Sequence, residues 1–200
     1  MGLGPERASW EDYEWFDPHS FVSADDSYLQ AGLESLRRDP LWLPGTSTRV
    51  LLVDLDNLRV ESVRLHARLA MTIALAREAD HVAFAGQEGS VRRARGNLAE
   101  FEDRAVIVGN GPDEADEALL AVASAVEDDD VQFIVVSNDN IFARLAMRGP
   151  LTVLSPGLQS LSDRLAEAAE RILDMAVIEA TVTAVRADPP VAKRSAGARR

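Results

Sequence analysis

From residue 49 onward, short apolar runs alternate with longer amphipathic segments. The apolar runs have the length of buried strands and lie at 49–55, 81–85, 105–108, 131–136 and 151–154. The segments between them repeat apolar residues at helical spacing and lie at 62–77, 88–104, 113–126, 140–147 and 159–174. Strands that alternate with helices indicate βαβ units. We therefore predict an α/β domain with a mainly parallel sheet of about five strands and helices on both faces.

The two ends of the chain lack this alternation. Residues 1–47 combine acids with aromatic residues, namely Trp10, Tyr13, Trp15 and Phe16, and the pattern predicts a short helix near 26–38. Two interpretations stay open for this N-terminal extension: it packs on the domain through its aromatics, or it is a partly disordered acidic arm. We place the domain at 48–185, where the apolar stretch 175–185 could add an edge element. A disordered basic tail is expected at 186–200.

Charge is distributed unevenly along the chain. The formal net charge is −12, and nine acids against three arginines give residues 1–47 a net −6, whereas the tail carries +4. The remaining residues, 48–185, which we call the core of the chain, carry a net charge of −10. This charge repels a phosphate backbone unless metal ions or a local basic patch intervene. The only dense basic cluster of the core is Arg92, Arg93 and Arg95. Two interpretations stay open: these arginines face an RNA backbone, or they form a solvated helix face paired with neighbouring glutamates.

The composition excludes several classes of binding site and indicates a cell compartment. It has no cysteine, which excludes disulfides and cysteine-based zinc sites and suits a reducing cytoplasm. No apolar stretch is long enough to span a bilayer, and no glycine loop has the spacing of a nucleotide-binding motif. The three histidines are scattered, so we expect them to be ordinary structural residues. Abundant arginine and alanine with a single lysine indicate a GC-rich bacterial genome.

Carboxylates follow three of the predicted strands. In open parallel sheets, ligands bind beyond the carboxyl ends of the strands. The polar residues expected at this edge are Asp54, Asp56, Asn57, Asp113, Asp116, Ser137, Asp139 and Asn140. Clustered carboxylates repel one another unless a cation such as Mg²⁺ or Mn²⁺ lies between them. Helix capping is the alternative for Asp116 and Asp139 and the preferred role for Asp113, whereas Asp54 ends an apolar strand and is costly there without a partner.

Four segments, in order, resemble the NYN branch of the PIN-like ribonucleases. They cover about residues 49–174 and read VLLVDLDNL, DEADEALLAVA, FIVVSNDNIFARLA and LTVLSPGLQSLSDRLAEAAERIL. The resemblance implies a PIN-like fold and metal-dependent cleavage of RNA with Mg²⁺ or Mn²⁺. It assigns the catalytic metal-binding roles to Asp54, Asp116 and Asp139. It gives supporting or orienting roles to the polar neighbours Asp56, Asn57, Ser137 and Asn140.

One position departs from the family. Where the family carries a second aspartate two residues after Asp139, this chain has Ile141. A missing acid weakens a second cation position, so we expect weak or highly selective RNase activity. One alternative is a catalytically degenerate NYN-like module that binds or regulates, with an acidic surface or N-terminal extension facing a protein partner. Another is a HAD-type phosphotransferase, because Asp54 and Asp56 form a DxD pair, although the later lysine and acidic motif of that class are missing.

Overall fold

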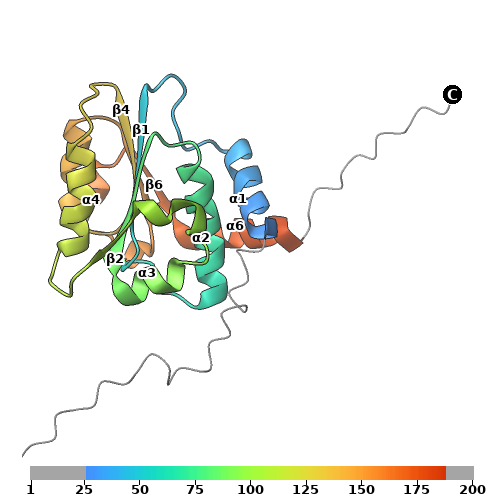
Figure 1. Cartoon of the computed structure of the whole chain (residues 1–200). Helices are drawn as coiled ribbons and strands as arrows, with labels where there is room; N and C mark the ends of the chain where they lie inside the picture. Colours follow the sequence, from blue (N-terminus) through green and yellow to red (C-terminus); the bar gives the residue numbers. More distant parts are fainter. Residues whose placement is uncertain (1–25, 188–200) are drawn as a thin grey trace, which may run out of the picture.

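A computed structural model of the chain describes residues 26–187, which form an α/β domain (Figure 1). Its sheet has six strands, all parallel, in the order β3-β2-β1-β4-β5-β6. The strands are β1 Thr48–Asp54, β2 His81–Gln87, β3 Ala105–Val108, β4 Val131–Val136, β5 Leu151–Ser155 and β6 Arg171–Asp174. The predicted fold class and the five predicted strands are confirmed, and β6 is a sixth strand that was not predicted.

Helices cover both faces of the sheet, as predicted. The α-helices are α1 Asp26–Arg38, α2 Ser62–Ala76, α3 Glu88–Ala94, α4 Glu114–Ser124, α5 Asp163–Ala168 and α6 Met175–Ala187. The 3-10 helices are η2 Ala99–Arg104, η3 Asn140–Met147 and η4 Leu158–Ser160. Figure 1 shows α4 on one side of the sheet and α1, α2 and α6 on the other. Each side has its own hydrophobic core, one with α1, α2, α3 and α6, the other with α4, η3 and α5.

The C-terminal third differs from the prediction. The helix expected over 159–174 is divided into η4, α5 and the edge strand β6, which pairs with β5 from Thr152–Arg171 to Ser155–Asp174. Pairing with β5 satisfies backbone groups that a helix would satisfy internally, so tertiary context overrides the local periodicity. Residues 175–187 then form α6, which packs on α1 and α2, and not an edge element.

Two further helical segments differ from the prediction. The helix predicted over 88–104 ends at Ala94, and the chain turns at Arg95–Leu98 before η2 begins. Asn97 in this turn is buried, and its Oδ1 lies 2.9 Å from His66 Nδ1 on α2. The segment 140–147 is helical, but as a 3-10 helix.

Residues before β1 contribute to the core. The predicted helix near 26–38 is present as α1, and Tyr28, Leu41 and Trp42 are buried in the same cluster as α2 and α6. Gln132 of β4 fixes the connection, because its Nε2 donates to Leu41 O and its Oε1 accepts from Leu43 N. The aromatic residues Trp10, Tyr13, Trp15 and Phe16, and the tail from 188, lie outside the described residues. Within 26–187, no helix has the length and apolar character to cross a membrane.

Candidate metal centre

The strand order creates a topological switch point at the carboxyl ends of β1 and β4, the place where parallel α/β sheets form their ligand-binding crevice. These two strands are neighbours at the centre of the sheet, and the chain leaves them toward opposite edges, to β2 and to β5. Asp54 is the last residue of β1, and Ser137 to Asp139 directly follow β4. The sequence-predicted acids therefore lie at the edge of the sheet that we expected.

Three carboxylates meet beside this crevice. Asp113, Asp116 and Asp139 each place one carboxylate oxygen so that all three oxygens lie within 4.8 Å of one another. We call these three residues the acidic cluster. Asp116 is buried, Asp139 is half-buried and Asp113 is exposed. The cluster can supply oxygen ligands to a hard divalent cation from two separate places, the start of α4 and the loop after β4.

Asp113 does not have the role that we preferred for it. It occupies the position before α4, but its side chain makes no capping hydrogen bond, and its backbone is left-handed at φ 61° and ψ 4°. The N-cap prediction failed because a capping side chain needs an extended backbone to reach the first N–H groups of the helix. Asp139 likewise precedes η3 without capping it. Sequence patterns contain no signal for the left-handed turn, so they could not place Asp113 in the cluster.

Asp116 is the most perturbed member of the cluster. Its Oδ1 is the one buried side-chain polar atom, among the described residues, that has no hydrogen-bond partner. Burial raises the pKa of Asp116, and the charges of Asp54, Asp139, Asp113 and Asp56 raise it further, to about 7. An unpaired buried carboxylate surrounded by other carboxylates is costly. A cation would relieve both the desolvation and the repulsion.

Asp54 lies next to the cluster but is held by its own hydrogen bonds. The side chain is 3% exposed, and its Oδ2 accepts from Asn57 Nδ2 and, at 3.3 Å, from Ser137 Oγ. Burial raises the pKa of Asp54, and hydrogen bonds from Asn57 and from the Asp56 backbone oppose that rise. Within the described chain, Asp54 is not one of the three acids that meet within 4.8 Å. Among the neighbouring carboxylates, Asp54 raises the pKa of Asp116 the most. It therefore faces the cluster from the β1 side.

The other predicted polar residues divide into two kinds. Ser137 Oγ also accepts from Asp139 N at 3.2 Å, so Asn57 and Ser137 connect the loops after β1 and β4. Asp56 connects the loop after β1 to the start of α3. Its Oδ1 accepts from Ser90 Oγ at 2.6 Å and its Oδ2 from Gln87 N at 3.0 Å. Both oxygens of Asp56 are therefore used to fix the start of α3. Asn140 is exposed at the start of η3.

A buried asparagine that the sequence analysis did not select holds the neighbouring loop. Asn138 Nδ2 donates to Gly157 O at 3.0 Å and Ser160 Oγ at 2.7 Å, and its Oδ1 accepts from Ser155 Oγ at 2.6 Å. The loop after β5 is thereby fixed to the loop that carries Asp139. Only the pairing of β4 with β5 identifies this role, because nothing in the local sequence distinguishes Asn138 from an exposed loop asparagine.

Ile141 stands where the family has an acid, and it faces the protein. The side chain is half-buried and packs against the hydrophobic core that contains Phe142, Leu119 and Leu165. A carboxylate at this position would need a different side-chain direction to reach the cluster. The position therefore belongs to the packing of η3.

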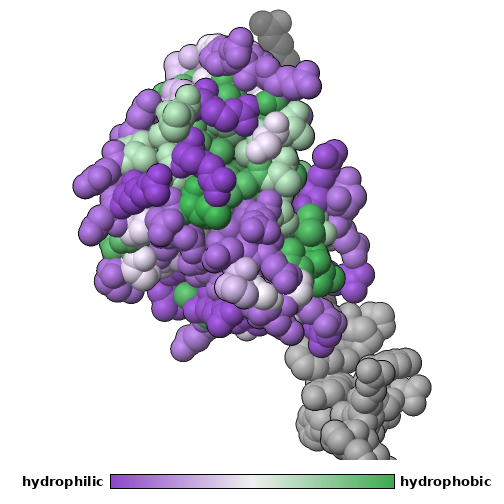
Figure 2. Space-filling model, turned by 90° about the vertical axis from the view of Figure 1, so that its left-hand side faces the viewer, coloured by the Kyte–Doolittle hydropathy of each residue, from purple (hydrophilic) through white to green (hydrophobic). Residues whose placement is uncertain are grey.

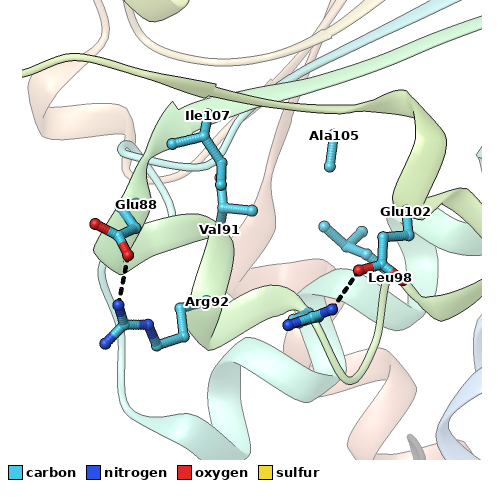
Figure 3. Close-up of a pocket in the computed structure, with 8 residues that line it drawn as sticks. Glu88, Val91, Arg92, Leu98, Glu102, Ala105 and Ile107 are labelled. Atoms are coloured by element: carbon cyan, nitrogen blue, oxygen red, sulfur yellow. Dashed lines mark hydrogen bonds and ion pairs between the residues drawn. The ribbon is translucent and has the colours of Figure 1, made fainter. Parts of the chain in front are cut away.

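The arginine cluster lies on α3, where its charges are partly compensated. Arg92 pairs with Glu88 and Arg95 with Glu102, each at 2.6 Å, and both pairs are exposed. Glu100, another neighbouring glutamate, pairs with Arg77 and not with one of these three arginines. Figure 3 shows the two pairs at the rim of a cavity of about 310 Å³ between α3, η2 and β3. Its apolar lining is Val91, Leu98, Ala105 and Ile107, so this cavity is separate from the acidic cluster.

The face formed by the α4 layer is mostly hydrophilic. Figure 2 shows hydrophilic residues over most of it, with hydrophobic residues gathered mainly in its upper central part and interrupted by hydrophilic ones.

Comparison with known proteins does not assign the chain to a family. No protein family model matches the sequence, and no curated protein matches it. Among solved structures, the chain is similar to a crystal structure of a protein of unknown function from Vibrio parahaemolyticus. That alignment has a TM-score of 0.42 and 14% sequence identity, and it covers 66% of this chain and 95% of the other. A similarity of this degree identifies neither a family nor a function.

Proposed function

We propose that this chain is a metal-dependent ribonuclease of the NYN/PIN-like type that uses Mg²⁺ or Mn²⁺. The observation that carries the proposal is Asp116, whose buried Oδ1 has no partner while its carboxylate lies beside those of Asp113 and Asp139. Carboxylates arranged in this way fit a hard cation with oxygen ligands. RNA as the substrate class comes from the resemblance of residues 49–174 to the NYN motifs. The absence of cysteine favours a cytoplasmic site of action.

Each residue of the site would have a distinct role in binding the cation and the substrate. Asp116 and Asp139 would hold the cation, and Asn57 and Ser137 keep the carboxylate of Asp54 fixed beside them. When bound, the cation would activate a water and neutralise charge on a phosphodiester. The charge of Asp54 makes the electrostatic potential of the crevice more negative. The crevice would therefore attract cations, and it would repel RNA when no cation is bound. The chain would thus need the metal for binding RNA as well as for cleaving it.

The arginines on and just after α3 form a basic surface that an RNA backbone could contact. The first turn of α3 is hydrogen-bonded to Asp56 in the loop after β1, so the arginines of α3 begin close to the crevice. Exposed ion pairs such as Arg92–Glu88 are worth little in water and exchange readily for other partners. Arg92, Arg93 and Arg95 are therefore our candidates for phosphate contacts.

The test is cleavage of one structured and one unstructured RNA with Mn²⁺. Wild-type protein should cleave slowly, and Asp139→Asn and Asp54→Asn should each reduce the rate by about a hundredfold or more, because charge stabilisation at a metal site is lost. Glu117→Gln, which removes an exposed acid from the same region, is the control and should leave the rate unchanged. Cleavage that survives Asp54→Asn and Asp139→Asn would come from another site or a contaminant and would refute the proposal.

A second candidate function is a catalytically degenerate module that binds a basic protein. Two observations favour it. Ile141 packs against the hydrophobic core at the position where an acid is expected, and residues 48–185 carry a net charge of −10. The same assay separates the candidates. A folded wild-type protein that binds Mn²⁺ but cleaves neither RNA would favour the binding module.

A further inference from the structure

Asp113 has a left-handed backbone, a conformation that aspartate and asparagine adopt more readily than other L-residues do. Among the described residues it is the only one other than glycine with a positive φ. The left-handed region crowds the Cβ of an L-residue, and glycine adopts it without that penalty. An aspartate before a helix ordinarily recovers stability by capping it, but the Asp113 side chain makes no capping bond. For the backbone alone, glycine would therefore be more stable at this position, and asparagine would be as stable as aspartate.

The direction of the Asp113 side chain supplies a reason for an aspartate at this position. The left-handed turn brings its carboxylate within 4.8 Å of oxygens on Asp116 and Asp139, where it increases the repulsion acting on Asp116. Neutral residues would fit the same turn without this repulsion. The buried, unpartnered Oδ1 of Asp116 is a second and independent sign that a ligand completes this place.

We propose that Asp113 is a third ligand of the divalent cation and supplies the carboxylate that the chain lacks at position 141. Ile141 directs its side chain to the core, so the loop after β4 contributes one acid, Asp139. The start of α4 contributes two, Asp113 and Asp116, from positions three residues apart. This inference rests on the proposed function only in treating the acidic cluster as a cation site, and it does not require RNA cleavage.

Two substitutions separate the charge of Asp113 from its backbone. Asparagine tolerates a left-handed backbone and keeps one neutral oxygen, whereas glycine fits the backbone best and removes the side chain. Both variants should fold, because neither introduces strain, and both should melt at a higher temperature than wild type without metal, because they remove repulsion. Their affinity for a cation should decrease in the order wild type, Asp113→Asn, Asp113→Gly, because carboxylates bind hard cations better than amides do.

The measurement is calorimetric titration of the full chain with Mn²⁺ alone at about pH 8, where Asp116 is ionised. Asp113→Asn should bind Mn²⁺ at least about tenfold more weakly than wild type, and Asp113→Gly more weakly still. Asp116→Asn is the positive control for loss of binding. Glu117→Gln removes an exposed acid from the same turn of α4 and should change the affinity by no more than about twofold.

The outcomes distinguish this inference from the proposed function. Wild-type affinity in Asp113→Gly, with binding lost in Asp116→Asn, would overturn the role of Asp113 and leave the ribonuclease proposal standing. Failure of the wild type to bind Mn²⁺ would overturn both. Binding that depends on Asp113, in a protein that cleaves no RNA, would support this inference and refute only the ribonuclease activity.

Discussion

A carboxyl group that titrates near neutral pH links this site to the stability of the whole protein. The pKa of Asp116 is about 7 in the folded chain and 3.8 in its ordinary state, mainly because the group is buried. Between these two values the folded state binds a proton that the unfolded state has lost. The contribution of this group to stability is therefore favourable at low pH and disappears as the pH rises toward 7.

The first prediction follows from the direction in which the stability contribution of Asp116 changes with pH. Without metal, the melting temperature should decrease between about pH 5 and pH 8, and saturating Mn²⁺ should reduce the decrease, because a cation stabilises the ionised form. Asp116→Asn should remove most of this pH dependence, since the amide does not titrate. Thermal melts in a chelator and in Mn²⁺, at several pH values, provide the measurement. A pH dependence that is the same in wild type and Asp116→Asn would contradict the assignment.

At the residue scale, the sequence predicted which acids lie at this edge of the sheet. Asp54, Asp116 and Asp139 were predictable as neighbours there, because Asp54 and Asp139 closely follow apolar strands and Asp116 lies in the first turn of the helix after β3. Asp113 and Asn138 were not. The role of Asp113 depends on a single left-handed φ, and that of Asn138 on the neighbouring loop after β5. Neither a backbone angle nor a contact between distant loops leaves a periodic signal in the chain.

The same contrast appears among the elements. The strands β1, β2, β4 and β5 are nearly continuous apolar runs because both faces of the sheet are covered by helices. Edge strand β6 has the sequence RILD and no buried residue, and its Ile172 is exposed, so it lacks that pattern. Its identity as a strand depends on pairing with β5. The predicted helix over 159–174 was wrong for this reason.

Ile141 gives a prediction about η3. Replacing it with aspartate should destabilise the protein by about 1–3 kcal/mol, because a charge would enter a half-buried apolar contact. It should not increase Mn²⁺ affinity, since the side chain points toward the core. Met147→Asp is the matched control, because Met147 ends the same helix and is 91% exposed.

Urea unfolding of the two variants tests this prediction directly. The control should be within about 0.5 kcal/mol of wild type, as is usual for exposed positions. An Ile141→Asp protein that is as stable as wild type and binds Mn²⁺ more tightly would show that position 141 opens onto the crevice.

Considered as a whole, the domain includes more of the N-terminal region than the periodic pattern indicates. Trp42 is 5% exposed, and its Nε1 donates to Leu75 O at the end of α2. Together with Gln132, it attaches the segment before β1 to both a helix and a central strand. A segment without periodicity can thus be integral to a core, because a few large side chains suffice to anchor it.

The prediction at this scale concerns Trp42. Trp42→Ala should reduce the free energy of unfolding by about 3–5 kcal/mol, through lost burial and the cavity that remains. Leu43→Ala, at a neighbouring position that is 43% exposed, should cost much less. Denaturant unfolding monitored by circular dichroism compares the two. Equal effects of both variants would mean that the segment is only loosely attached.

Edge strand β3 has a consequence for how the protein behaves in concentrated solution. Ile107 is 60% exposed and Val106 41% exposed on a strand with one unpaired side, a combination that templates association between molecules. The net charge of −12 keeps molecules apart at low ionic strength, and added salt screens it. We expect turbidity to grow with salt and Ile107→Lys to suppress it, whereas Val177→Lys, at a similarly exposed position on α6, should not. The charge that opposes RNA binding would then also act as the protein's protection against precipitation.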